Sequence, residues 1–329
     1  MRKFLADRGA SFALALLLLA PCAEAFDSAA WQEKRGDLAH EVARLRAAYK
    51  TCANGDQAPA EEVVLPIETF PDGSVKTSVQ AKKARYFLDS GLVWADGVVV
   101  RRFKADGTTD IRLEAAECVV DRLTKSGWAE GDVKLEQGGT VCRGRGVYFS
   151  SPEGFVRVTE SADFATTDLK AAKPGAKTLF KAPAAGETNA CLRIRSAACD
   201  IDRDAGVTLF ETNVVVTHAD TTLCADRVFA FAVASNQLSR IVADGHVAVT
   251  NGLRTGACSL AVYRRARGEM EMFGAKDGPK AHFAETGERA NELEGDRIRF
   301  WVDSEQVEVT NAALATKRDD NKMKGELLR

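Results

Sequence analysis

The sequence predicts an all-β protein, built from antiparallel hairpins stacked side by side, with a short N-terminal helix. The first observation is a repeated corner: WADGVVV at Trp94–Val100 returns 34 residues later as WAEGDVK at Trp128–Lys134, and again as VADGHVAV at Val242–Val249. The second is an alternation of apolar and polar residues with period two, which is typical of a half-buried antiparallel sheet. The third is that no helical period long enough to cross over a parallel sheet follows residue 60.

One helix is expected, over residues 31–50. Its apolar residues are spaced 7, 4, 3 and 4 apart and form one stripe, with charged residues on the other face; they are Trp31, Leu38, Val42, Leu45 and Tyr49. The stripe can pack on the protein's own core or dock a partner, and the first interpretation is the more common.

The strands are clearest where polar residues separate apolar ones. In GDVKLEQ, Val133 and Leu135 face one side, and Asp132, Lys134 and Glu136 face the other. Turns such as PDGS at residues 71–74 arrive at hairpin spacing, with Pro to set φ and Gly for a positive φ. The sequence therefore predicts consecutive hairpins with one apolar and one solvated face.

The chain also contains a tandem duplication of about 115 residues, visible when residues 76–100 are placed over residues 191–216. A smaller unit of about 35 residues recurs within the halves, as Ala81 and Ala115 or Gly97 and Gly131 show. Repeats of this size indicate supersecondary units that bury a core only by stacking. The pairs related by a shift of 115 are Val79 and Ile194, Ala84 and Cys199, Asp89 and Asp204, and Gly91 and Gly206.

The N-terminus has the composition of a cleaved secretory signal. Arg2, Lys3 and Arg8 precede a short apolar run, and Ala23-Glu24-Ala25 supplies a small-x-small cleavage pattern, so the mature chain is expected to begin at Phe26 in the periplasm. The predicted division is a signal peptide at 1–25, a helical segment at 26–60, a first β-module at 61–168, a linker at 169–189, a second β-module at 190–316 and a charged tail at 317–329.

Charge and cysteine content exclude several classes of function. A net charge of −2 gives no electrostatic footprint for nucleic acid. Export permits disulfides, and seven cysteines remain after cleavage, without CxxC or zinc-ligand spacing. The nearest pair, Cys191 and Cys199, is a candidate disulfide; the alternative is that these cysteines are small buried hydrophobic residues.

No set of residues indicates catalysis. The sequence lacks GxSxG, P-loop, HExxH and DxDxDG motifs. Its carboxylates, such as Asp89, Asp204 and Asp244, recur at the corners and turns of the repeat, where Asp serves turn formation. We therefore expect no enzyme activity, no metal and no cofactor.

A stack of hairpins with a continuous apolar face suits the binding of acyl chains, which need apolar area more than directed hydrogen bonds. Arg101, Arg102, Arg143 and Arg145 can meet acidic head groups at a rim. The alternative is that the same apolar residues fill a closed core. The candidates for an apolar trough are Val98, Val100, Leu113, Val133, Leu135, Val147, Phe149, Val214, Val216, Phe229, Phe231, Val247, Val249, Val262, Met270, Met272, Ile298 and Phe300.

The repeated pattern x-A-x-x-A-x-Y, polar turn and small-D/E-G-x-V-x-V resembles the OstA-like β-jellyroll modules of lipopolysaccharide export proteins of the LptA and LptC types. PDGSVKTSVQAKKARYFLDSGLVWADGVVV is similar to the opening of the LptC type, so the first module is LptC-like. TTLCADRVFAFAVASNQLSRIVADGHVAV and NELEGDRIRFWVDSEQVEV are similar to LptA-type repeats, so the second is LptA-like. The resemblance implies two V-shaped antiparallel sheets that hold lipid acyl chains and join other proteins through edge strands.

These observations together predict a periplasmic lipid-binding or bridge protein. Its expected partners are lipopolysaccharide or another acyl lipid and other envelope transport proteins, and edge pairing can also join copies of the chain. The alternative is an envelope scaffold that assembles through β-edge strands and carries no lipid.

Overall fold

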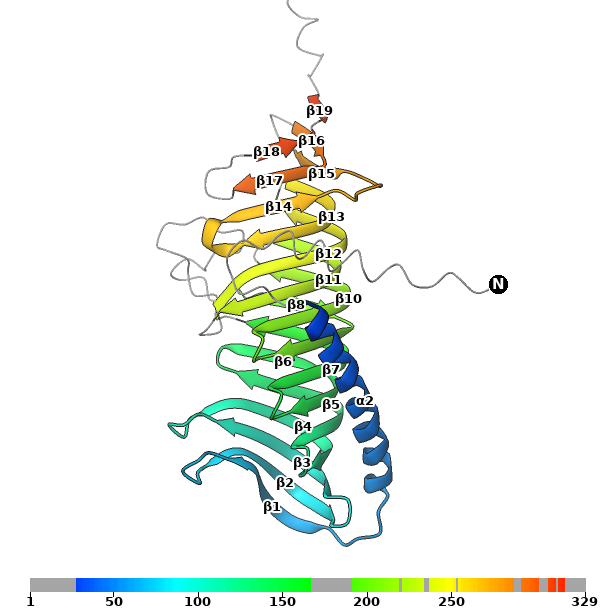
Figure 1. The fold of residues 1–329 in the computed structure, drawn as a ribbon, viewed down its shortest axis with the longest axis vertical. Coiled ribbons are helices and arrows are strands. Elements are labelled where there is room, and N and C mark those ends of the chain that lie inside the picture. The colour runs from blue at the N-terminus through cyan, green and yellow to red at the C-terminus, as the bar shows by residue number, and fades with distance from the viewer. Residues whose placement is uncertain are drawn as a thin grey trace, which may run out of the picture.

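The structure is a computed structural model, and it describes residues 28–166, 191–218, 221–233, 237–252, 254–286, 291–301, 307–311 and 313–316. In this part of the chain one α-helix accompanies a single 19-stranded sheet whose strand pairs are all antiparallel. Figure 1 shows the strands stacked along the long axis of the molecule. The all-β prediction with one N-terminal helix is confirmed; the predicted signal peptide, linker and tail lie outside the described residues.

The helix is α2 (Ser28–Ala53). The strands of the first half are β1 (Ala60–Thr69), β2 (Val75–Phe87), β3 (Leu92–Phe103), β4 (Thr109–Asp121), β5 (Ser126–Gln137), β6 (Thr140–Ser150) and β7 (Phe155–Thr166). Those of the second half are β8 (Leu192–Ser196), β9 (Ala198–Asp202), β10 (Val207–His218), β11 (Thr221–Val233), β12 (Gln237–Asn251), β13 (Arg254–Arg264), β14 (Glu269–Phe273), β15 (Ala281–Glu285), β16 (Asn291–Gly295), β17 (Arg297–Trp301), β18 (Val307–Thr310) and β19 (Ala313–Thr316), with a 3-10 turn η1 (Arg265–Arg267) before β14.

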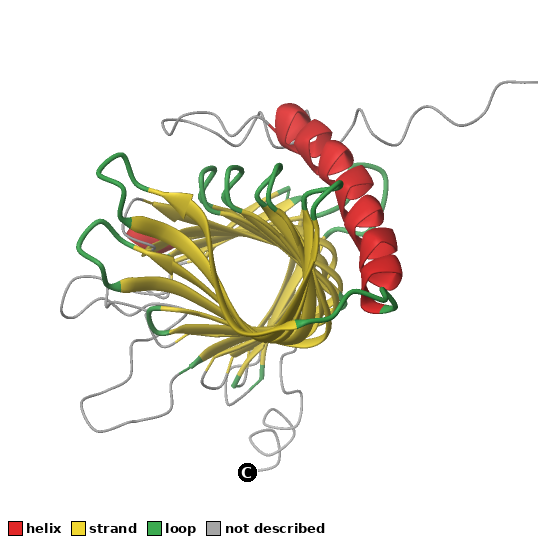
Figure 2. Ribbon diagram, turned by 90° about the horizontal axis from the view of Figure 1, so that it is seen from below, coloured by secondary structure: helices red, strands yellow, loops and turns green. Residues whose placement is uncertain are grey.

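The long strands bend at a corner and so contribute to two layers around an apolar interior (Figure 2). Gly97 and Gly131 of the repeated motif lie at corners, with φ of 63° and 72°, a conformation that favours glycine. At the corner that contains Gly131, the pairing register of β5 with β6 shifts between Ala129 and Asp132. Such a bulge inserts an unpaired residue and bends the strand. We name the two layers by the strands they contain. The first layer holds the starts of β4 and β6, which pair with the ends of β3 and β5; the second layer holds the ends of β4 and β6, which pair with the starts of β3 and β5.

The duplication seen in the sequence is confirmed by the pairing register. Ala84 and Cys199 belong to one row of residues paired from strand to strand on the inner side of the second layer. Val79 and Ile194 likewise share an inner row of the first layer. Residues 115 positions apart therefore occupy equivalent places, as stacking of repeated units requires.

The ladder of strands continues from the first half into the second. β7 pairs with β8 near its end and with β9 near its start, and both of these pair with β10. The pairs Phe164 with Ile194 and Val158 with Cys199 keep the two inner rows aligned across this junction. The described residues of the two halves thus form one uninterrupted sheet; the predicted boundaries at 168 and 190 lie outside the described residues.

Helix α2 lies on the outer side of the second layer (Figures 1 and 2). Leu38, Leu45 and Cys52 are buried against a cluster on β3 to β7, which includes Trp94, Val119, Trp128, Tyr148 and Phe155. The expected apolar stripe is thereby confirmed, and it packs on the protein's own sheet. No helix among the described residues is both long and apolar enough to cross a membrane.

The first turns of α2 are held by polar contacts at the junction of the two halves. Trp31 Nε1 and Lys34 Nζ each donate to Asp202 Oδ2 at 3.1 Å. Arg35 Nε donates to Asp200 Oδ2 at 2.6 Å, and another nitrogen of its guanidinium pairs with Glu211. Because Asp200 and Asp202 are only 3% and 1% exposed, these contacts neutralise carboxylates that would be costly to bury alone.

Acidification is expected to weaken the docking of α2. Arg44 donates to Glu41 and Asp121, at 2.6 and 2.7 Å. The bond from Arg44 lowers the pKa of Glu41. Burial alone would raise the pKa of Asp121, but Arg44 and two backbone N–H groups hold it below its usual value. A carboxyl whose pKa is lower in the folded than in the unfolded state stabilises the fold above the unfolded pKa and loses this effect as the pH falls.

We therefore expect the free energy of unfolding to decrease below about pH 4.5, as both carboxyls become protonated. Urea unfolding at a series of pH values measures this decrease, with Asp121→Asn as the comparison. The variant should show a shallower decrease, because one of the two carboxyls is missing. An equally steep decrease in both proteins would contradict the assignment to Asp121.

Candidate functional site: the interior between the layers

The inner faces of the two layers share one hydrophobic cluster that extends through both halves. Met272 and Ile298 of the second half continue the inner row that contains Cys118 and Val147 in the first. Most of the predicted trough residues lie in this cluster: Val98, Val100, Leu113, Val133, Leu135, Val147, Phe149, Val214, Val216, Val247, Val249, Met270, Met272 and Ile298. Phe300 lies beside them, since it pairs with Met270 and its ring stacks on Phe283 with centroids 5.9 Å apart.

Phe229, Phe231 and Val262 were predicted in the trough but lie on the outer side. They belong to a separate cluster with Trp31, whose ring centroid is 6.2 Å from that of Phe229. The cause is the corner: on β11 the register shifts between Cys224 and Arg227, so Val228 faces inward in place of Phe229. One extra residue moves every later side chain to the opposite face.

A small cavity opens into the interior at the edge farthest from the corners. Its volume is about 60 Å³, and its walls include Val100, Leu113, Leu135, Phe149 and Val156. Because a water molecule occupies roughly 30 Å³ and ligand sites typically roughly 300–1,000 Å³, this space cannot hold a lipid. At this opening the described side chains leave room for about two water molecules, so an acyl chain can enter here only if the layers part.

Only one of the four predicted rim arginines lies at this opening. Arg102 lines the cavity together with Arg203, which was not among the predicted rim residues. Arg101 donates to Gln80 on the neighbouring strand. No motif marks Arg203, because it lies in a β-turn and its place at the opening follows from the fold.

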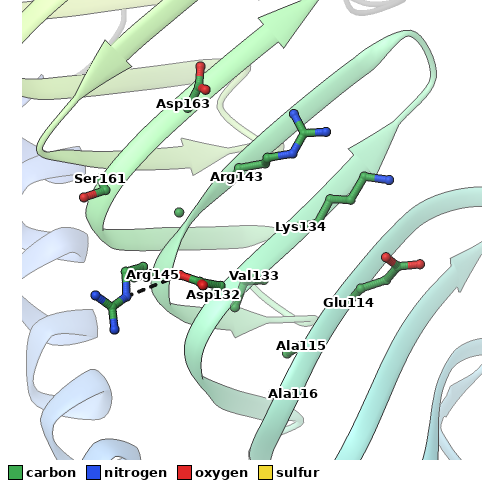
Figure 3. A pocket seen from close by; sticks show the side chains of 11 residues that line it. Glu114, Ala115, Ala116, Asp132, Val133, Lys134, Arg143, Arg145, Ser161 and Asp163 are labelled. Atoms are coloured by element: carbon green, nitrogen blue, oxygen red, sulfur yellow. Dashed lines mark ion pairs between the residues drawn. The ribbon is translucent and has the colours of Figure 1, made fainter.

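Arg143 and Arg145 instead line a hollow of about 620 Å³ near the corners of β4 to β7 (Figure 3). The acidic and basic side chains of this hollow are largely paired: Arg145 Nε lies 3.3 Å from Asp132 Oδ1, and Arg193 pairs with Asp163. Lys134 likewise pairs with Glu136 on its own strand. This balance of charge disfavours a strong site for a single anion.

The predicted Cys191–Cys199 disulfide is not present in the structure, where both cysteines are free. Cys191 directly precedes β8, whereas Cys199 lies on β9, on the other side of the corner between these two strands. Several residues of extended chain therefore separate the two cysteines. A disulfide requires Cα atoms within roughly 7 Å. Cys199 instead has Cys142 as a neighbour, and burial together with this second thiol raises the pKa of Cys199.

The structure brings no group of three or more His, Cys, Asp or Glu side chains into metal-binding range within the described residues. His246 Nδ1 lies 2.8 Å from Asp226 Oδ2, but both side chains are exposed on the outside of a corner. The fold and its interior therefore define a repetitive antiparallel β-protein that encloses a long apolar core.

A comparison with protein families finds a match in the second half. Residues 193–306 match the model of the LptA/(LptD N-terminal domain) LPS transport protein family. The match falls within the second half and supports the resemblance to OstA-like modules that its repeats predicted.

A solved structure shows a weaker likeness. LptH from Pseudomonas aeruginosa, the LptA homologous periplasmic component of its lipopolysaccharide transport device, is 14% identical, with a TM-score of 0.34, and the match covers 39% of this chain and 95% of LptH. A comparison with curated protein sequences found no match.

Proposed function

We propose that this protein is a periplasmic carrier or bridge that holds the acyl chains of lipopolysaccharide between its two β-layers on the way to the outer membrane. The observation that carries the proposal is the inner apolar row that crosses the junction of the halves without a charged residue. Acyl chains need apolar area along their length, and a continuous row offers it from the first module to the second. The family match of residues 193–306 supports the same cargo.

The proposal includes two modules, residues 61–168 and 190–316, that share one trough. It further assigns the chain to the periplasm after removal of residues 1–25 and gives it no catalytic step or cofactor. We infer that loading at the opening beside Arg102 and Arg203 separates the layers, because the cavity there is far smaller than a lipid. The cost of exposing apolar side chains during this separation would be offset by the acyl chains that replace their contacts.

Photocrosslinking can test the position of the lipid. Photoreactive residues at Val133, Val247 or Phe300 face the interior, whereas their neighbours Lys134, Ala248 and Arg299 face outward on the same strands. With labelled lipopolysaccharide we expect lipid adducts at the inward positions and few at their outward neighbours. Equal labelling of both sets would contradict binding between the layers.

An envelope scaffold is the second candidate, because the ladder has an open edge. Within the described residues β1 pairs only with β2, and Val64 on β1 is 63% exposed. Unpaired edges can add a strand from another protein or another copy of the chain. Protein adducts from a photoreactive residue at Val64, without lipid adducts at Val133, Val247 and Phe300, would favour the scaffold over the carrier.

A further inference from the structure

The opening of the cavity is crossed by an ion pair between strands that are distant along the ladder. Arg203, in the turn after β9, donates to Asp110 Oδ2 on β4 at 2.8 Å. β5, β6 and β7 lie between β4 and β9 in the ladder. Adjacent strands are about 4.8 Å apart, so a contact within one layer would have to span roughly 19 Å. The ion pair must therefore connect the first layer to the second.

A second set of contacts crosses the same opening. Ser151 lies in the turn after β6, and its Oγ is 3.3 Å from Thr77 Oγ1 on β2. The Ser151 hydroxyl also donates to Glu68 Oε2 on β1 at 2.6 Å. Lys76 Nζ donates to Glu68 Oε1 at 2.7 Å. Burial would raise the pKa of Glu68, but the bonds from Lys76 and Ser151 hold it below its usual value. The carboxylate thus stays charged and keeps accepting these bonds.

Behind these contacts lies the apolar cavity, and two guanidinium groups flank it. Arg203 is paired with Asp110, and their side chains are 23% and 17% exposed. Arg102 lines the same cavity and has an electrostatic influence on Glu68. Guanidinium groups bind phosphate or carboxylate oxygens in a bidentate geometry, and the neighbouring walls accept hydrocarbon. The combination fits a molecule with an anionic head and acyl chains.

We propose that the Asp110–Arg203 ion pair, together with the bonds of Ser151 to Thr77 and Glu68, is a latch that keeps the layers closed over the first half of the interior. An anionic amphiphile opens the latch by replacing Asp110 as the counter-ion of Arg203, while its acyl chains enter the space between the layers. Since Arg203 belongs to the second half and Asp110 to the first, opening also couples the two halves. This inference rests on the proposed lipid-carrying function.

The test compares the affinity of the full chain for two fluorescent probes with identical acyl chains, phosphatidic acid and diacylglycerol. Asp110→Asn removes the competing carboxylate and leaves Arg203 in place. We expect this variant to bind phosphatidic acid about two- to five-fold more tightly than the wild type, the range that loss of a partly exposed ion pair allows. Arg203→Gln should reduce the preference for phosphatidic acid over diacylglycerol. Asp163→Asn, which removes a similar pair with Arg193 on the outer side, should leave both affinities unchanged.

The outcomes separate the latch from the carrier function. If the wild type binds the probes but Asp110→Asn behaves like Asp163→Asn, the latch is wrong and the carrier function stands. If no variant binds either probe, both proposals fail. Inorganic phosphate should compete weakly; competition as strong as that of phosphatidic acid would indicate a site for a free anion and would overturn the latch. Circular dichroism spectra of the variants verify that each is folded.

Discussion

Replacing Trp128 with alanine is expected to lower the free energy of unfolding by about 3–5 kcal/mol, the range for removing a large aromatic side chain from a core. Trp128 is 1% exposed and lies in the cluster that α2 covers. Its Nε1 donates to Glu130 Oε2 at 2.8 Å, and the guanidinium carbon of Arg46 lies 5.4 Å from its ring centroid. The substitution would leave a cavity under the helix and would remove both contacts.

Trp301→Ala is the matched control. Trp301 is half-buried on β17, and the guanidinium of Arg299 lies over it as Arg46 lies over Trp128. Because this site is partly solvated, Trp301→Ala should lower the free energy of unfolding by only about 1 kcal/mol. Urea unfolding followed by circular dichroism measures both values. If the two variants lost the same stability, the helix-covered cluster would not be a major source of stability.

The regular part of the fold could be predicted because equivalent residues of the repeat occupy the same row of the sheet, so the repeat indicates how neighbouring strands pair. Trp94, Trp128 and Val242 begin the three copies of the corner motif, and the structure places all three on the outer side of the second layer. Equivalent residues must meet equivalent neighbours when identical units stack. The helix could be predicted for a related reason, since its stripe matches the helical period.

The faces of strands beyond their corners could not be predicted from alternation alone. Counting by two from Leu223 places Phe229 and Phe231 inside, and the bulge at the corner reverses this assignment. The residue left unpaired differs between strands: it is Gly97 on β3, whereas β10 has both Thr212 and Asn213 at positive φ. A period of two therefore holds only within each layer.

Polar contacts between distant segments also left no signal in the sequence. Asp110 and Arg203 are separated by 93 positions, and Arg35 and Asp200 by 165. All four residues lie in stretches that contain other charged residues, so nothing in the sequence distinguishes them. Only the arrangement of the layers and the helix shows that they pair. For the same reason the sequence could identify an apolar face but could not show whether side chains from the other layer already fill it.

The second large effect is expected for Asp200→Ala, at about 3–5 kcal/mol of lost stability, because one partner of a buried ion pair would be removed. Arg157 donates to both carboxylate oxygens of Asp200, at 2.7 and 2.9 Å, and Arg35 adds a bond from the helix. Burial lowers the pKa of Arg157, but the bond to Asp200 more than offsets this and keeps the guanidinium charged. Asp200 therefore joins β7 of the first half, β9 of the second half and α2.

Asp163→Ala provides the control, since Asp163 and Arg193 form a similar pair between β7 and β8 at the same junction. Their side chains are 25% and 45% exposed, compared with 3% for Asp200 and 15% for Arg157. Because solvent screens this exposed pair, Asp163→Ala should lower the free energy of unfolding by only about 0–1 kcal/mol. Protease cleavage within α2 gives a second readout, because only Asp200→Ala removes a partner of Arg35 and leaves Glu211 as its one remaining carboxylate partner among those described. Equal losses in the two variants, or an unchanged rate of cleavage in Asp200→Ala, would show that the helix does not depend on this carboxylate to hold the two halves together.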